Sequence, residues 1–311
     1  MAQPSSSFIQ YKRSVASQHG EDGIIEHIFS ILKPANRLCV EFGAGDGKYD
    51  SNTWNLIHNH GWSAVLIESH PGYFSRLRKE YKTNPNVQAF NLIVDFQGEH
   101  TLDNILDRAK GVPKNIDFLS IDIDGNDYHI WDSLVTYRPR VIMIECNLRI
   151  PPSLSFIQPR DLSISWGSSL KALVELGTRK GYELIYAKSM NAIFVLKELF
   201  PLFNIIDNAP ETIGIFSEQD AKFFQLFDGS IVLENVRPHN ILLFKKKPRH
   251  PIFVYNSEAL IPVPFRKRQF LRVVKNLIKK IPFYYKVADS IVARVYGKKW
   301  EKEKKTLRAI R

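Results

Sequence analysis

The sequence predicts an α/β fold, a seven-stranded and mostly parallel sheet with helices on both faces and an antiparallel last hairpin. Three observations lead to this prediction. Short apolar runs alternate with helical stretches between residues 14 and 200, which is the pattern of βαβ units. The runs are apolar throughout, as expected for strands that are covered on both faces. The last two, YELIYA and NAIFVLK, are separated by a turn too short for a crossover helix, so they should pair antiparallel.

The first half of this pattern contains three strands. In SQHGEDGIIEHIFSILKP, Ile24, Ile28 and Leu32 recur at helical spacing, and Pro34 ends the helix. The elements predicted to follow are the strand LCVEF, a helix in SNTWNLIHNHG, the strand SAVLIES, a helix in PGYFSRLRKEY and the strand VQAFNLIV. Gly61, just past the second helix, is a common helix-end signal.

The second half adds two helix-linked strands and the hairpin. In order, it contains a helix in TLDNILDRA, the strand IDFLSIDID, a helix carrying Tyr128, Trp131 and Leu134, the strand RVIMIECN and a helix in SSLKALVELGTRKG. Beyond Glu198 the pattern weakens, and a hairpin is expected in FFQLFDGSIVLEN, around Asp228 and Gly229. We therefore expect a core at residues 1–200, an accessory region at 201–264 and a tail at 265–311.

The composition narrows the class of protein. The 311 residues are 44% hydrophobic, which is ordinary for a globular protein. No run reaches the roughly 18 apolar residues that span a bilayer, and MAQPSSSFIQYKR lacks the pattern of a secretion signal. Cys39 and Cys146 both lie in apolar runs, which predicts buried reduced thiols rather than a disulfide framework. These features predict a cytoplasmic protein.

The positive charge is confined to the end of the chain. Residues 266–311 carry 16 of the 43 Lys and Arg residues but only 3 of the 32 Asp and Glu residues, which leaves 27 and 29 for the rest. FRKRQFLRVVKNLIKKI has an apolar stripe and an opposite basic stripe at helical spacing. This predicts a basic amphipathic helical tail. Three uses stay open: peripheral contact with the inner face of an anionic membrane, packing or oligomer contact, and nucleic-acid binding, which is the least favoured.

The loop after the first predicted strand, EFGAGDGK, combines glycines with an acidic residue. A dinucleotide-binding fingerprint needs a third glycine at position 48, where the chain has lysine, and its pyrophosphate would be repelled by Glu41. A ligand with a cationic group would instead be favoured by that carboxylate. Gly43 and Gly45 would allow its close approach to the backbone.

VEFGAGDG resembles motif I of the class I S-adenosylmethionine-dependent methyltransferases, whose Rossmann-like sheet also has seven strands and an antiparallel last hairpin. The resemblance implies that Glu68, which closes the second strand, binds the ribose hydroxyls and that Asp95 lies near the adenine. The residues it implies for binding S-adenosylmethionine are Glu41, Gly43, Ala44, Gly45, Glu68, Ser69, Asp95 and Asp122.

Polar residues also follow the fourth and fifth predicted strands, in SIDIDGNDYHIW and IECN. In one interpretation, Asp122, Asp124, Glu145 and Asn147 hold Mg²⁺ or another divalent cation, which lowers the pKa of a substrate hydroxyl. In another, no metal is used and the catalytic residues are Asp122, Asp124 and His129, one of them as general base. A third interpretation is a turn that caps the next helix.

SQHGEDG, SIDIDGNDYHIW and SSLKALVELGTRKGYELIYAKSMNAIFVL together resemble the FkbM-like branch of these methyltransferases, over residues 14 to 200. That branch methylates hydroxyl oxygens, often of sugars or natural products. Related sugar O-methyltransferases use magnesium, but DIDG and Glu-Cys-Asn replace their acidic patterns here. The Asp/Asn-Pro-Pro-aromatic pattern of base N-methyltransferases is absent after the fourth strand. His19 is a site residue or part of a helix cap, and Arg160 and Trp166 are candidates for the acceptor wall.

The function predicted from the sequence is methyl transfer from S-adenosylmethionine to a hydroxyl of a sugar, glycan or related natural product. The alternative is a non-catalytic adaptor that docks on an anionic membrane or polyanion through the basic tail. A nucleotide-dependent oxidoreductase is opposed by the position of the third glycine.

Overall fold

The computed structural model describes residues 5–214, except Arg149, Pro151 and Ser163, together with the strands 222–225, 231–234 and 252–255. The chain divides into two compact units, residues 1–262 and 263–311. The predicted basic tail and most of the predicted accessory region lie outside the described residues. Among the described residues, no helix is long and apolar enough to cross a membrane.

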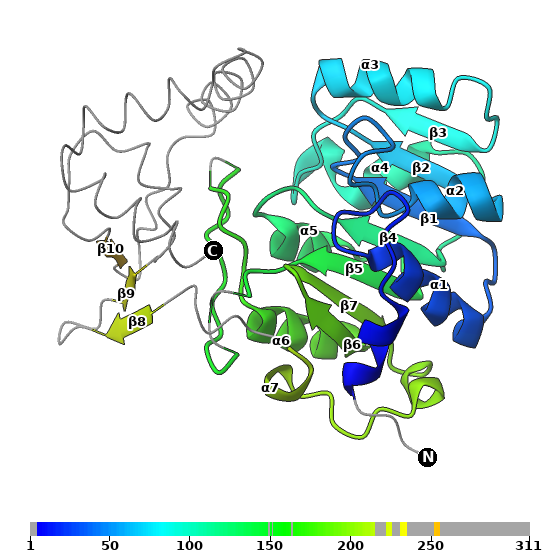
Figure 1. Cartoon of the computed structure of the whole chain (residues 1–311). Helices are drawn as coiled ribbons and strands as arrows, with labels where there is room; N and C mark the ends of the chain where they lie inside the picture. Colours follow the sequence, from blue (N-terminus) through cyan, green and yellow to red (C-terminus); the bar gives the residue numbers. More distant parts are fainter. Residues whose placement is uncertain are drawn as a thin grey trace, which may run out of the picture. The chain divides into compact units, whose positions relative to one another are not determined.

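Within the described part of the chain, seven strands form one sheet in the order β3-β2-β1-β4-β5-β7-β6 (Figure 1). Neighbouring strands are parallel except at β7, which is antiparallel to both β5 and β6. The strands are β1 (Leu38–Phe42), β2 (Ser63–Ile67), β3 (Val87–Phe90), β4 (Phe118–Ile121), β5 (Val141–Glu145), β6 (Tyr182–Lys188) and β7 (Asn191–Leu196). The predicted Rossmann-like sheet with an antiparallel last hairpin is confirmed.

Helices cover both faces of this sheet, as predicted (Figure 1). One hydrophobic core lies between the sheet and α1 (Glu21–Leu32), α2 (Trp54–His60) and α3 (Pro71–Glu80). The other lies between the sheet and α4 (Leu102–Arg108), α5 (Asp127–Ser133) and α6 (Leu170–Lys180). Short elements complete the unit: η1 (Ser5–Tyr11), η2 (Gly98–His100), η3 (Phe200–Phe203) and α7 (Pro210–Ile213).

The two cysteines lie in different cores. Cys39 is in the core below α1 to α3 and Cys146 in the core below α4 to α6, and both are buried free thiols. Burial raises the pKa of both thiols, because the thiolate would lose its hydration. Their predicted burial is confirmed.

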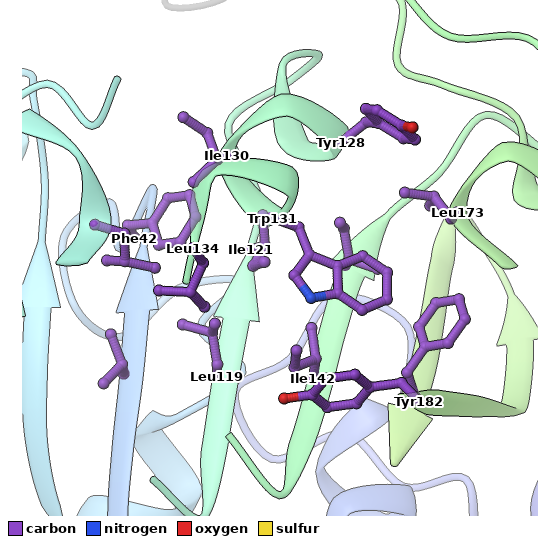
Figure 2. Close-up of a cluster of buried hydrophobic side chains, with 14 of the residues drawn as sticks. Phe42, Leu119, Ile121, Tyr128, Ile130, Trp131, Leu134, Ile142, Leu173 and Tyr182 are labelled. Carbon is purple, nitrogen blue, oxygen red and sulfur yellow. The ribbon is translucent and has the colours of Figure 1, made fainter. Parts of the chain in front are cut away.

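The side chain of Trp131 fixes α5 on the sheet (Figure 2). It is fully buried, and its ring lies 4.9 Å from that of Phe194 and 5.7 Å from that of Tyr182. A Cβ at Gly177 of α6 would come within 3.0 Å of Trp131, so a glycine there lets α6 approach closely. Because Trp131 is so enclosed, the turn that leads from β4 into α5 has a firm support.

The third strand is shorter than predicted. It ends at Phe90 rather than at residue 94, and the next side chain explains why. The Asn91 amide donates to the backbone carbonyls of Glu68 at 2.6 Å and Ser69 at 3.2 Å. The Asn91 side chain thus occupies the two backbone carbonyls that follow β2. The backbone beyond Phe90 does not continue the pairing with β2, and β3 ends there.

A second, antiparallel sheet is formed among the described strands by β8 (Lys222–Gln225), β9 (Ile231–Glu234) and β10 (Ile252–Tyr255), in the order β10-β9-β8. Gln225 pairs with Ile231. The hairpin predicted around Asp228 and Gly229 is therefore confirmed in its two strands.

Candidate active site

The candidate site lies at the carboxyl ends of β1, β2, β4 and β5, where the connecting loops of a parallel sheet form ligand-binding crevices. The loop before α1 reaches the same edge. Asn191, at the start of β7 and opposite Glu145, donates its amide to the buried carboxylate of Glu21 at 3.0 Å. Glu21 also accepts the backbone N–H of His19 at 2.8 Å, which fixes the N-terminal loop beside the strand ends.

Gly43 and Gly45 have different surroundings, although both have positive φ angles of 75° and 58°. A Cβ on Gly43 would lie 1.8 Å from the carbonyl oxygen of Asp122, so the loop after β1 packs directly on the turn after β4. A Cβ on Gly45 would meet no heavy atom within 4 Å. The first glycine permits close packing of the two loops, and the second borders open space.

Glu68 lies next to that space and is held by backbone groups. One carboxylate oxygen accepts the N–H of Gly45 at 2.8 Å and the other accepts the N–H of His70 at 2.6 Å. The side chain is 6% exposed, whereas Ser69 is exposed. Each oxygen retains acceptor capacity. A fixed carboxylate beside open space is suited to a ligand with two neighbouring hydroxyl groups.

Glu41 is turned toward its own chain. It is 3% exposed and accepts hydrogen bonds from the Ser51 hydroxyl at 2.7 Å, the Asn52 N–H at 2.7 Å and the Thr53 hydroxyl at 2.6 Å. Burial raises the pKa of this carboxyl, and the three donors oppose that rise. Glu41 thus ties β1 to the start of α2. Its predicted contact with a cofactor stays a prediction.

Two further predicted cofactor residues occupy other parts of this edge. Ala44 is buried, and its N–H donates to the carbonyl of Ile67 at 3.1 Å. Asp95 is partly exposed, and its carboxylate accepts the N–H of Phe96 at 2.6 Å. Asp95 follows β3 by five residues instead of closing it, because the strand ends early at Phe90.

The turn after β4 concentrates negative charge. Asp127 is buried and accepts the N–H groups of Ile123 and Gly125, both at 2.9 Å, so it shapes the turn. Asp124 is exposed and has a φ of 59°. Asp122 is partly exposed. Burial, followed by the neighbouring charges of Asp127 and Asp124, raises the pKa of Asp122. A carboxyl of raised pKa at a strand end is suited to exchange a proton with a ligand.

His129 does not face this edge with a free nitrogen. It is 5% exposed; its Nε2 lies 2.5 Å from the carbonyl of Gln158, and its Nδ1 accepts the Nε–H of Arg160 at 3.3 Å. Both ring nitrogens are therefore used inside the protein. In this conformation His129 cannot take a proton from a substrate, and the prediction of a histidine base gains no support.

The residues predicted to bind a metal do not form a cation site. Among the described residues, no group of three or more His, Cys, Asp or Glu side chains is arranged to hold a metal ion. Asn147, predicted with Asp122, Asp124 and Glu145 as a ligand, is buried and donates its amide to the carbonyl of Trp166 at 3.0 Å. The described residues therefore give the predicted divalent cation no support, and its binding stays a prediction.

Sequence reasoning missed two residues that organise the site. Asn91 ends β3 and holds the backbone of Glu68. Gln158 is fully buried and accepts the N–H groups of Trp166 at 2.7 Å and Gly167 at 2.8 Å. For Asn91, the only signal was the polar residue in the middle of the predicted strand VQAFNLIV. A glutamine in a polar loop gave none for the second.

Comparisons with known proteins find likeness in structure only. No family model matches the chain, and no curated protein matches it. Matched solved structures include the CMeT domain of the citrinin polyketide synthase (11% identity, 57% of this chain and 51% of that chain, TM-score 0.37). Another is the N-terminal domain of EvdMO1, solved in the presence of S-adenosylhomocysteine and D-fucose (11%, 56% and 81%, TM-score 0.35). A third is the CcbJ methyltransferase of Streptomyces caelestis (12%, 55% and 88%, TM-score 0.36).

This chain thus spans about half of the citrinin synthase domain. At these identities and TM-scores the matches do not identify a reaction or a substrate. The chemistry of the site has to be inferred from its own residues.

Proposed function

We propose that this protein is an S-adenosylmethionine-dependent methyltransferase that methylates a hydroxyl oxygen. The observation that carries the proposal is the pairing of the Glu68 carboxylate with the Gly45 N–H at 2.8 Å beside open space. A carboxylate in that position accepts hydrogen bonds from a ribose diol and attracts a cation. Because an acidic residue after the second strand also serves the ribose of dinucleotides, the distinction from NAD rests on the lysine that replaces the third glycine at position 48.

Three elements would hold the cofactor. Gly43 and Gly45 keep the loop after β1 close to the ligand, and Glu68 binds the ribose hydroxyls at the end of β2. Asp95, beyond β3, lies on the adenine side. S-adenosylmethionine supplies a methyl group made electrophilic by its sulfonium. The buried carboxylate of Glu41, with Asp22 nearby, adds negative potential behind the loop, which favours such a cation.

On the acceptor side, Asp122 is the proposed base. As the acceptor oxygen forms its bond to the methyl carbon, the carbon–sulfur bond breaks and the hydroxyl proton has to leave. The Asp122 carboxylate takes that proton and becomes the neutral acid, a form that the surrounding burial and negative charge already favour. Asp124, exposed two residues further on in the same turn, is suited to orient the acceptor. No step of this proposal is routed through a metal, because the described residues show no group of acidic, histidine or cysteine side chains arranged to hold one.

The acceptor class rests on the resemblance of SIDIDGNDYHIW and its companion segments to the FkbM-like branch. We propose a hydroxyl of a sugar, glycan or related natural product in the cytoplasm, with Arg160 and Trp166 on the acceptor side. The use of residues 266–311 for membrane contact stays a prediction, because they lie outside the described residues.

Calorimetric titration tests the cofactor. S-adenosylhomocysteine should bind the full chain, and NAD and NADP should not. Glu68→Ala removes the hydrogen bonds of the ribose to a charged group, and the loss of even one costs about 1.5–3 kcal/mol, so affinity should fall at least roughly 10- to 100-fold. Gly45→Val should reduce it as well by filling the open space. Glu99→Ala, whose side chain is 90% exposed, is the matched control and should bind like wild type.

If both site variants bind S-adenosylhomocysteine like wild type, the proposal is wrong. Deleting residues 266–311 separates the enzyme from the adaptor alternative, because an enzyme core would keep its affinity for S-adenosylhomocysteine. With binding established, transfer of labelled methyl groups to a panel of sugars, with EDTA or Mg²⁺ added, identifies the acceptor.

A further inference from the structure

The loop between β5 and α6 is folded around one buried side chain over its described residues 152–162 and 164–169. Gln158 accepts the N–H groups of Trp166 and Gly167 through its amide oxygen, and its amide nitrogen donates to the carbonyl of Ile164 at 3.1 Å. Its own N–H donates to the Ser168 hydroxyl at 3.2 Å. Four hydrogen bonds to a fully buried glutamine turn the loop back on itself, so its conformation is specified and not arbitrary.

This β5–α6 loop is also fixed to the turn that precedes α5. The Asn126 amide donates to the carbonyls of Asp161 at 2.9 Å and Ile164 at 3.3 Å. A Cβ at Gly125 would lie 2.7 Å from the Cα of Ser165. The loop therefore packs on the same short segment that carries Asp122 and Asp124.

His129 connects the β5–α6 loop to the segment that precedes α5, and its hydrogen bonds require one protonation state of the ring. A carbonyl oxygen such as that of Gln158 only accepts, and the Nε–H of Arg160 only donates. The ring must therefore carry its proton on Nε2 and keep Nδ1 free to accept. A protonated imidazolium has no acceptor, so it would lose the bond to Arg160 and place a second positive charge against it.

We propose that His129 is a positioning residue whose neutral ring locks the β5–α6 loop onto the acidic turn after β4, and whose protonation releases it. The link to acceptor binding rests on the proposed function. The lock itself does not, because it consists of contacts inside the protein. Phe96 completes its surroundings, with its ring centroid 5.7 Å from that of His129 and 5.8 Å from the Arg160 guanidinium carbon.

The charged and titratable groups around His129 set the direction of the effect. Burial lowers the pKa of His129, the hydrogen bond to Gln158 opposes this, Arg160 lowers it further and Asp132 raises it. Asp132 lies 3.1 Å from Arg160 and 3.8 Å from Arg179 of α6, which also donates to the Tyr128 hydroxyl at 3.0 Å. The net lowering keeps the ring neutral, and the loop locked, at neutral pH. Release should occur only in acid.

Trp166 reports the state of the loop without any substrate. Its emission is obtained as the difference between each protein and the same protein carrying Trp166→Phe, followed from pH 8 to pH 5. Wild type should show one transition with a midpoint below 6.5. His129→Gln, which offers an amide donor and acceptor but does not titrate, should show none. His100→Gln, at an exposed histidine, is the control and should keep the transition.

Two further variants keep the test decisive if His129→Gln fails to fold. Arg160→Gln removes the charge that lowers the pKa of His129, so its midpoint should move to higher pH. His129→Leu should give the released signal at every pH. A transition that persists in His129→Gln, or a midpoint that does not move in Arg160→Gln, overturns the lock.

The acceptor link has a separate readout. In His129→Leu the KM for the acceptor should rise at least fivefold, while affinity for S-adenosylhomocysteine stays within twofold of wild type, because Glu68 is held by the backbone of Gly45 and His70 and not by the β5–α6 loop. An acceptor KM within twofold of wild type overturns that link. Absence of S-adenosylhomocysteine binding in wild type would contradict the proposed function and leave the Trp166 test to decide the lock.

Discussion

The two ends of β4 carry aspartates with opposite surroundings. Asp117, just before the strand, is fully buried and accepts the N–H groups of Ala35, Asn36 and Arg37 at 2.7 to 3.0 Å. It also pairs with the Arg140 guanidinium at 2.6 Å. Asp122, just after the strand, keeps some exposure, and burial together with the neighbouring carboxylates of Asp127 and Asp124 raises its pKa.

This difference shows how one strand serves two purposes. At the amino end the buried charge is matched by donors and one cation, so it holds the turn after α1 to the sheet. At the carboxyl end, charges of one sign are gathered with less compensation, which costs stability. Such an arrangement is common where ionisation is part of the chemistry. The amino end is thus stabilised by matched charge, whereas the carboxyl end is the place where the proposed function puts its reactive carboxylate.

The largest loss of stability is expected from removing the buried charge of Asp117 at the amino end of β4. Asp117→Asn leaves the Arg140 guanidinium, which is 14% exposed, without its anion. Removing one partner of a buried ion pair costs roughly 3–5 kcal/mol. Urea unfolding of the full chain measures this loss. Asp107→Asn, at an exposed ion pair, is the control and should change little. A loss below about 1 kcal/mol for Asp117→Asn would show that the amino end is not held by this charge.

A second comparison tests the contact between the loop after β1 and the turn after β4. Gly43→Ala and Gly45→Ala both introduce a side chain at positive φ, which costs about 1–2 kcal/mol. Only Gly43→Ala also drives a Cβ into the Asp122 carbonyl, so its total loss should reach roughly 2–4 kcal/mol. Equal losses in urea unfolding would mean that the two loops are not packed as described.

The cost of gathering carboxylates at the carboxyl end of β4 can be measured from the pH dependence of stability. An acid with a raised pKa in the folded protein binds more protons when folded, so its ionisation lowers stability as the pH rises. Asp122→Asn should therefore gain stability relative to wild type between pH 4 and pH 8. After allowance for partial exposure, the gain should be on the order of 1 kcal/mol. If the difference from wild type is the same at both pH values, Asp122 is not strained. Methyl transfer by this variant should nevertheless fall.

The smallest effect is expected at a paired but exposed carboxylate. Glu198 accepts two hydrogen bonds from Arg138, at 2.8 and 3.2 Å, and both side chains are about half exposed. Glu198→Gln should cost about 0.2–1 kcal/mol, since water screens the pair. A loss as large as that of Asp117→Asn would mean that pairing, and not burial, decides the effect.

The sequence was sufficient for the features encoded by local pattern. Continuous apolar runs identified the strands, and the short polar turn before Asn191 identified the antiparallel hairpin. The glycine loop and Glu68 could be assigned to strand ends because each follows its own apolar run directly. In all these cases the informative residues are neighbours in the chain.

The roles of Asp117, Gln158 and His129 could not be read in this way. Asp117 binds backbone groups 80 to 82 residues away, and Gln158 meets His129 across 29 residues. Only the folded chain brings such partners together. Residue type suggested a catalytic histidine, but the structure uses both of its ring nitrogens for packing a loop. Likewise, the sequence offered four possible oxygen ligands for a cation, but it gave no sign that the amide of one of them, Asn147, donates to the Trp166 carbonyl 19 residues away.

The two cysteines can report on unfolding, because they lie in the two different hydrophobic cores. Each thiol is enclosed in a different face of the sheet, and a buried thiol of raised pKa resists alkylation until its surroundings open. The rates at which Cys39 and Cys146 react with iodoacetamide, resolved by peptide mass spectrometry, would therefore time the opening of each face separately. No engineered label is needed to learn which half of the molecule comes apart first.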